Sequence, residues 1–149
     1  MGLFDAIDIS GSALSAERLR MDVTAENLAN ANTTRGANGA AYRRKVVVMQ
    51  EQGGSPGSSF GNTLAAEMRR GDKPGGVQVA AIAEDTTPNR RVYDPGHPDA
   101  DQDGYVEMPN VDSVTEMVDL ISASRAYEAN VTAMQSAKTL FTKTLELLR

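Results

Sequence analysis

The chain has 149 residues and a formal net charge of −5, with 20 acidic and 15 basic residues. The absence of Cys excludes a disulfide framework, a thiol nucleophile and a cysteine-built zinc site. The acidic charge argues against general nucleic-acid binding, which needs a basic face, and no apolar run approaches the ~18 residues of a membrane span.

Residues 1–34 are predicted to form a long helix and its end. The first five residues have neither a basic start nor a continuous apolar run, so we expect no cleavable signal peptide. Apolar side chains recur every seven residues and give the helix one thin stripe that needs a packing partner. This row consists of Ile7, Leu14, Met21 and Leu28. An Asn- and Thr-rich segment at 27–34 then ends the helix, because these side chains compete for backbone hydrogen bonds and Asn tolerates a left-handed conformation.

Residues 35–109 contain all six Pro and most of the Gly, which predicts an irregular region with little core of its own. Runs rich in β-branched residues, bounded by turn residues, predict short strands within it. The predicted strands are 42–49, 76–84, 91–93 and 105–108. The Gly- and Ser-rich stretch near 52–75 is expected to be a flexible linker.

Residues 110–149 contain neither Gly nor Pro and predict a second long helix, from 113 to about 147. Ser113 and Glu116 fit a capping box, in which each side chain satisfies a backbone N–H group of the first turn. Acidic residues near the start and basic residues near the end complement the helix dipole.

A heptad repeat runs along this second helix. One row is apolar at every position, and a companion row is apolar at three of five. The rows are Leu120, Tyr127, Met134, Phe141 and Leu148, and Met117, Ser124, Val131, Lys138 and Leu145. Alternating steps of three and four residues predict a coiled coil with the N-terminal helix. The pattern leaves open whether the stripes pack within one chain or between subunits.

The Asp-rich segment 99–107 follows the start of a calcium-binding loop, with Asp at positions 1, 3 and 5 and Gly at position 6. Position 12, which holds a bidentate Glu in such loops, is Asn110, and Pro95 and Pro98 exclude the usual incoming helix. A solvated acidic turn is therefore favoured. A small calcium- or peptide-binding module over residues 99–110 remains the alternative function.

No residue pattern indicates catalysis. His97 is the sole imidazole, has no nucleophile beside it in the sequence, and is predicted to be hydrogen-bonded within its loop. The cluster Arg43, Arg44 and Lys45 predicts a solvated strand edge or salt bridges rather than a phosphate site. Phosphate-loop, serine-hydrolase and zinc-protease motifs are absent from the sequence, so we expect no enzyme, no cofactor and no metal site.

Five segments, taken together and in order, resemble the flagellar basal-body rod proteins, within the wider family of flagellar axial proteins. They are 27–34, 42–44, 92–98, 104–111 and 124–130. The Asn-rich helix end and the Ser-Arg-Ala-Tyr-Glu-Ala-Asn segment at 124–130 are similar to those of axial proteins generally. The stretch from His97-Pro98 to the Gly-Tyr-Val and Met-Pro-Asn-Val sequences of 104–111 points to one kind of rod protein rather than to hook or hook-associated proteins.

The resemblance implies a structural subunit of the proximal rod, the drive shaft of the flagellum. Such subunits pass unfolded and uncleaved through the flagellar type III export apparatus and assemble in the periplasm. The implied partners are other rod proteins and further copies of the chain. We also include the Asn-rich helix end in the predicted assembly interface.

The predicted fold is mainly α with a small β element, in which long N- and C-terminal helices pair as a coiled coil around an irregular middle region. The predicted segments are 1–34, 35–109 and 110–149. The predicted assembly interface consists of Ile7, Leu14, Met21, Asn27, Leu28, Asn30, Asn32, Met117, Leu120, Tyr127, Val131, Met134, Phe141, Leu145 and Leu148.

Overall fold

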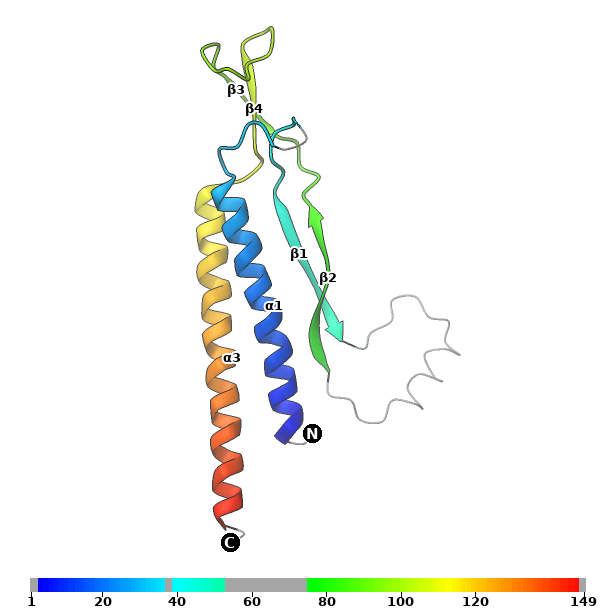
Figure 1. Ribbon diagram of the computed structural model, residues 1–149, viewed down its shortest axis with the longest axis vertical. Coiled ribbons are helices and arrows are strands. Elements are labelled where there is room, and N and C mark those ends of the chain that lie inside the picture. Colours follow the sequence, from blue (N-terminus) through cyan, green and yellow to red (C-terminus); the bar gives the residue numbers. More distant parts are fainter. Residues whose placement is uncertain (1–2, 37–38, 53–74, 148–149) are drawn as a thin grey trace, which may run out of the picture. The chain divides into compact units, whose positions relative to one another are not determined.

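A computed structural model describes residues 3–36, 39–52 and 75–147 of the chain (Figure 1). The elements, in chain order, are α1 (Leu3–Ala29), β1 (Lys45–Gln52), β2 (Gly76–Glu84), β3 (Arg90–Tyr93), β4 (Tyr105–Met108) and α3 (Ser113–Leu147). The mainly helical fold with a small β content is thereby confirmed. Most of the predicted linker near 52–75 and the predicted interface residue Leu148 lie outside the described residues.

The element boundaries follow the sequence pattern closely. α3 and the strands β2 and β4 begin and end where the sequence predicts. β1 differs, because it begins at Lys45 rather than at residue 42. The reason is local: the backbone N–H of Arg44 donates to the side-chain Oδ1 of Asn110 at 2.8 Å, so Arg44 is held by a loop instead of a strand ladder.

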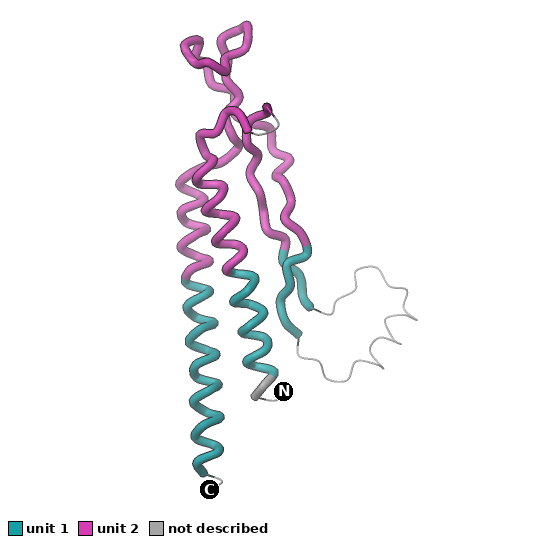
Figure 2. The backbone as a smooth tube through the Cα atoms, viewed as in Figure 1, with its two compact units in different colours: residues 1–17, 49–80, 125–149 teal, residues 18–48, 81–124 magenta. Residues whose placement is uncertain are grey.

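The chain divides into two compact units, each assembled from segments far apart in the sequence (Figure 2). The first unit contains residues 1–17, 49–80 and 125–149, and the second contains 18–48 and 81–124. Fully buried apolar side chains are small in both. The first unit buries Ala16 and Ala137, and the second buries Val23, Ala41, Val106 and Ala123.

Two small sheets complete the fold. β1 and β2 are neighbours in one two-stranded sheet, and β3 and β4 form an antiparallel pair in the other. In that pair Tyr93 lies opposite Tyr105, with ring centroids 5.3 Å apart in an edge-to-face arrangement. Gly104 has a φ of 78°, and a Cβ there would lie 3.0 Å from Cε2 of Tyr93. The turn therefore needs glycine both for its left-handed backbone and for the space that the Tyr93 ring occupies.

α1 ends at Ala29, at the Asn-rich segment, as predicted. Of the two reasons expected, the left-handed conformation is not found, because no non-glycine residue in the described part of the chain has a positive φ. Asn30 instead donates its side-chain N–H to the carbonyl of Glu26 at 2.9 Å, and Thr33 donates its hydroxyl to Oδ1 of Asn30 at 3.1 Å. Side-chain bonds, rather than a left-handed residue, end the helix.

The start of α3 also differs from the prediction. The predicted capping box is wrong: Asp112 is the N-cap, accepting hydrogen bonds from the backbone N–H of Val114 at 3.1 Å and from the hydroxyl of Thr115 at 2.8 Å. These bonds lower the pKa of Asp112 below its usual value. Glu116 is thereby released from capping, and its carboxylate is used elsewhere. Among the described helices, none combines the length and apolarity needed to cross a membrane.

Candidate functional site

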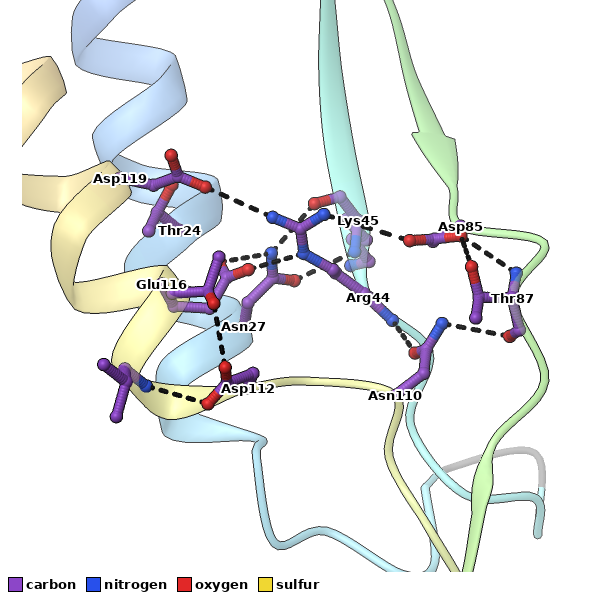
Figure 3. Close-up of polar contacts among 12 residues, drawn as sticks. Thr24, Asn27, Arg44, Lys45, Asp85, Thr87, Asn110, Asp112, Glu116 and Asp119 are labelled. Atoms are coloured by element: carbon purple, nitrogen blue, oxygen red, sulfur yellow. Dashed lines mark hydrogen bonds and ion pairs between the residues drawn. The ribbon is translucent and has the colours of Figure 1, made fainter.

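The most highly organised polar site of the second unit surrounds Asn27, near the end of α1. Asn27 is only 1% exposed, and it lies between the first turn of α3 and the start of β1 (Figure 3). Its Nδ2 donates to the carbonyl of Lys45 at 2.8 Å and to Oε2 of Glu116 at 3.0 Å. Its Oδ1 accepts from the hydroxyl of Tyr42 at 2.8 Å and from the backbone N–H of Lys45 at 2.9 Å. We call Asn27, Tyr42, Arg44, Lys45, Glu116 and Asp119 the polar hub.

The four bonds of Asn27 use the full donor and acceptor capacity of its amide. Two of them go to the N–H and C=O of one residue, Lys45, so the side chain pairs with β1 as a neighbouring peptide group would. A buried polar group that is fully satisfied fixes the geometry around it, because any displacement leaves donors or acceptors without a partner. Asn27 therefore fixes the positions of α1, β1 and α3 within the second unit.

Glu116 carries the buried negative charge of the hub and is also 1% exposed. Its Oε2 accepts from Asn27, and its Oε1 accepts from Nε of Arg44 at 2.5 Å. The Glu116 hydrogen bond raises the pKa of the Arg44 guanidinium above its usual value. Because a buried carboxylate without a partner would be strongly destabilising, burial of Glu116 depends on its ion pair with Arg44.

The Arg44 guanidinium extends the hub to two further carboxylates. It lies 3.2 Å from Oδ2 of Asp119 on α3 and 3.9 Å from Oδ2 of Asp85, which follows β2. Arg20 of α1 lies 3.8 Å from Asp119, which adds a second link between the two helices. One guanidinium thus contacts both α3 and the chain after β2 (Figure 3).

Hydrogen bonds between side chains and backbone groups connect the loops of the second unit to the polar hub. Asn110, just before α3, accepts from the backbone N–H of Arg44 and donates its Nδ2 to the carbonyl of Thr87 at 3.1 Å. Thr87 in turn donates both its N–H and its hydroxyl to Asp85. The loops on either side of the hub are therefore fixed by amide and carboxylate side chains rather than by apolar packing.

Tyr42 and Lys45 form the more exposed edge of the hub. The Lys45 ammonium lies 2.6 Å from Oε1 of Glu26 and 5.8 Å from the centre of the Tyr42 ring. Burial, with a further contribution from the negative charge of Glu26, raises the pKa of Tyr42 to about 12. The folded chain therefore holds the Tyr42 proton, which is donated to Asn27, more strongly than an exposed tyrosine would.

The hub has the character of a structural joint. Its two carboxylates are both paired with Arg44, and its amide and phenol groups are hydrogen-bonded to one another. Such an arrangement differs from a catalytic site, where a nucleophile or base faces a site for substrate. Its effect is to hold the end of the N-terminal helix against the beginning of the C-terminal helix.

The Asp-rich loop is occupied by internal contacts of its own. Asp99 lies 3.6 Å from Arg35 and accepts from the hydroxyl of Thr34. Asp101 accepts from the backbone N–H of Asp103 and of Tyr105 and pairs with Arg91. The carboxylates thus close an acidic turn, as favoured above, and the described residues contain no group of three or more metal-ligating side chains close enough to hold an ion.

The remaining sequence candidates are also placed locally. His97 accepts through Nδ1 from the backbone N–H of Asp99 at 3.1 Å, which confirms that it is hydrogen-bonded within its loop. Of the basic cluster, Arg44 and Lys45 form the predicted salt bridges, and Arg43 is exposed.

The predicted interface residues of α1 occupy different environments. The heptad row Ile7, Leu14, Met21 and Leu28 is half-buried throughout. The three Asn differ from one another: Asn27 is buried in the hub, Asn30 is half-buried at the helix end, and Asn32 is exposed.

On α3 the predicted rows separate. The described members of the first row, Leu120, Tyr127, Met134 and Phe141, are half-buried. In the companion row Val131 is half-buried, but Met117 and Leu145 are 46% and 52% exposed. The residues that directly precede the first four members of the companion row are less exposed: Glu116, Ala123 and Ala137 are buried, and Asn130 is half-buried.

Sequence reasoning missed most of the hub. Tyr42 and Asp119 were not predicted as site residues, and Arg44 was predicted only to form salt bridges. Glu116 was predicted only as a capping residue, because a Glu in the first turn of a helix is usually a capping or surface residue. One signal pointed toward it: the Asn-rich helix end holds more amides than a helix terminus requires. Asn27 explains one of them, because its side chain bonds both to residues 42–45 and to Glu116 of α3.

Comparison with known proteins identifies the family. Residues 7–37 match the model described as "Flagella basal body rod protein", and residues 102–147 match "Flagellar basal body rod FlgEFG protein C-terminal". The flagellar basal-body rod protein FlgC of Bacillus subtilis (strain 168) is 48% identical over 152 residues, which cover 99% of each chain. The FlgC proteins of Yersinia enterocolitica and Salmonella typhimurium are 47% and 44% identical, each over 99% of this chain and 98% of the relative.

The chain belongs to the FlgC family of flagellar basal-body rod proteins. It is accordingly a structural subunit of the flagellar basal-body rod and not an enzyme. The two family matches include α1 from residue 7 onward and all of α3, so Asn27 and Glu116 both lie in matched segments. Tyr42, Arg44 and Lys45 lie between the matches, and in this FlgC-family chain they complete the joint.

Proposed function

We propose that this FlgC-family subunit builds the proximal rod by pairing its two terminal helices as a coiled coil and by stacking with copies of itself and with other rod proteins in a helical array. In this role the chain is one part of the drive shaft that transmits torque for motility. The function is mechanical, and it needs helices that keep one fixed register.

The observation that carries the coiled-coil proposal is the spacing of inward positions on α3. Glu116, Ala123, Asn130 and Ala137 are seven residues apart, and three of them are fully buried. Ala16 and Val23 of α1 are also seven apart and buried. Burial at a strict interval of seven residues is the signature of helices that pair along a left-handed supercoil.

Large apolar side chains left exposed support contacts between subunits. Leu140, Leu145 and Leu147 of α3 are 59%, 52% and 88% exposed. Apolar surface of this kind on a helix marks a place where another protein packs. Contacts between different surfaces of like subunits generate open helical assemblies rather than closed pairs, which suits a rod.

The proposal extends to export and location. We infer that the chain passes unfolded and uncleaved through the flagellar type III export apparatus and assembles in the periplasm. The small apolar core supports this, because no buried side chain among the described residues belongs to Leu, Ile, Met or Phe. Burying small side chains stabilises less than burying Leu, Ile or Phe, so the free subunit unfolds easily and gains stability from its neighbours.

The experiment replaces Met134, a half-buried heptad residue, with Asp on the chromosome. A charge forced into the helix interface is costly to desolvate, so we expect normal export but no incorporation into basal bodies and no swimming. Phe141→Asp should behave in the same way. Ser136→Asp is the matched control, since Ser136 is exposed on the same helix, and this strain should swim. Normal swimming by the Met134→Asp strain would refute the proposal.

A further inference from the structure

The first unit contains a close contact between α1 and the start of β2. The backbone N–H of Val77 donates to Oγ of Ser12 at 3.1 Å, and the Ser12 hydroxyl donates to the carbonyl of Ile9 at 2.8 Å. Gly76, the first residue of β2, is buried beside Ser12. All four residues belong to the first unit, so this contact is separate from the polar hub. We call Ser12, Gly76 and Val77 the strap joint.

Gly76 is required here for space rather than for backbone conformation. The described glycines with a positive φ are Gly39 and Gly104, and Gly76 is not among them. A Cβ at position 76 would lie 2.8 Å from Oγ of Ser12 and 2.8 Å from Oε1 of Gln52. The Gln52 oxygen is the end of a long, exposed side chain and can move, whereas Oγ of Ser12 is held by two hydrogen bonds. The missing side chain of Gly76 therefore lets the strand backbone approach the helix closely.

The strap joint lies on the opposite side of α1 from its apolar heptad row. Ile7 and Leu14 are five residues before Ser12 and two residues after it. With ~3.6 residues per helical turn, both lie about 140–160° around the helix from Ser12. Both are half-buried. β2 thus contacts one side of this part of α1, and the heptad row on the other side remains for helix pairing.

We propose that in the assembled rod this face of α1 is filled by β2 of the same subunit, held by the strap joint, and is not a contact between subunits. The inference rests on the proposed assembly into a rod and adds which side of α1 is available to other helices, namely the side of Ile7 and Leu14. A neighbouring helix at Ser12 would displace β2 and leave the backbone N–H of Val77 without its acceptor. Gly76 would at the same time lose the close contact for which its missing side chain makes room.

The natural chain contains no Cys, so an introduced disulfide reports directly on the joint. A Cβ at position 76 would lie 3.4 Å from Cβ of Ser12, close to the ~3.5–4.5 Å that a disulfide requires. Full-length subunits that carry both Ser12→Cys and Gly76→Cys replace the natural chain, and peptide mapping after mild oxidation of purified basal bodies locates the link. We expect positions 12 and 76 to be linked within one chain of 15.9 kDa. Ser15→Cys with Gly76→Cys is the matched control, because Ser15 is exposed on the same helix and is not part of the joint, and it should give far less linked product.

Two results of this experiment would overturn the proposal. A link between positions 12 and 76 of two different chains, at twice the subunit mass, would show that the start of β2 contacts a neighbouring α1. Subunits that are present in basal bodies with both cysteines and stay unlinked would show that the joint is open in the rod.

A second comparison decides the question if the Cys pair does not enter basal bodies. Gly76→Ala should lower the amount of subunit in basal bodies, because its methyl group meets Oγ of Ser12. Ser12→Ala in the same chain removes that oxygen, so Gly76→Ala should then lower the amount less. Equal losses in both backgrounds would overturn the joint, and relief in a strain that expresses the two single variants as separate chains would overturn its placement within one subunit. Failure of the proposed rod function shows differently, as absence of the natural subunit from basal bodies.

Discussion

Replacing Asn27 with Ala tests whether the polar hub holds the second unit together. The substitution removes four hydrogen bonds at a residue that is 1% exposed. It leaves the N–H and C=O of Lys45, the hydroxyl of Tyr42 and Oε2 of Glu116 without their partner. The Tyr42 hydroxyl is half-buried and can bond to water, but the Glu116 carboxylate is fully buried and keeps only its bond to Arg44.

The expected loss follows from these groups. A buried polar group left without a partner costs about 1–3 kcal/mol, and more when it is charged. Counting the Glu116 oxygen and the two backbone groups of Lys45, we expect the free energy of unfolding to fall by about 3–5 kcal/mol. Because a small protein is stable by only about 5–15 kcal/mol, this is a large fraction of the total. With an ordinary denaturant dependence, the urea midpoint should fall by about 1–3 M.

The assay is urea unfolding of the purified full-length chain, followed by circular dichroism. Asn32→Ala is the matched control, since Asn32 lies five residues further along and is exposed, and its midpoint should stay within error of the natural chain. Asn27→Asp adds a second test: it keeps both acceptors but loses both donors and places a carboxylate beside Glu116, so it should be at least as destabilising as Ala. Equal midpoints for Asn27→Ala and Asn32→Ala would refute the structural role of the hub.

Two further substitutions probe single features of the second unit. The Tyr42 pKa of about 12 lies above its ordinary value of 10.0, so the folded chain holds this proton more strongly than the unfolded chain; the resulting stabilisation is complete below pH 10 and is lost as the pH rises toward 12. Tyr42→Phe should remove this part of the pH dependence of stability. The measurement is the difference between the urea midpoints at about pH 9 and about pH 11, which should be smaller in the variant than in the natural chain. An equal difference in both would be the contrary result. Gly104→Ala should destabilise the β3–β4 pair by about 1–2 kcal/mol from its left-handed backbone alone, with a further cost from the 3.0 Å approach to Tyr93. Amide hydrogen exchange at Val106 should quicken, whereas Gly96→Ala, where a Cβ would meet only Oδ1 of Asp94 at 3.6 Å, should leave it unchanged.

The sequence predicted the elements well because each depends on local pattern. The long helix over 113–147 follows from the absence of Gly and Pro and from the heptad repeat, and the described α3 has these bounds. The short strands follow from β-branched runs between turn residues, and β2 and β4 match the prediction. These signals lie within a few residues of the structure that they specify, so one chain is enough to read them.

The hub could not be predicted, because its bonds join residues far apart in the chain. Asn27 and Glu116 are 89 positions apart, and Arg44 and Glu116 are 72 apart. Locally, Glu116 fits a capping box with Ser113, and only the three-dimensional structure shows that Asp112 performs the capping. For the same reason the sequence does not predict that Glu116 is buried while Met117 is exposed: Met117 is more apolar than Glu116, but Asn27 and Arg44 make burial of Glu116 favourable.

The second unit has paired polar groups inside and large apolar side chains outside, an arrangement that suits a subunit of a rod. Apolar residues in the hub would pack in many ways, whereas the fully paired amide of Asn27 and the Arg44–Glu116 ion pair allow one arrangement of helix and strand. Large apolar side chains that lie outside the interior, such as Val118 and Ile121, are exposed on α3, and the fixed position of the helix fixes the direction in which they point. A subunit built in this way gains little stability from its own core and offers its apolar surface to its neighbours, so folding and assembly reinforce each other.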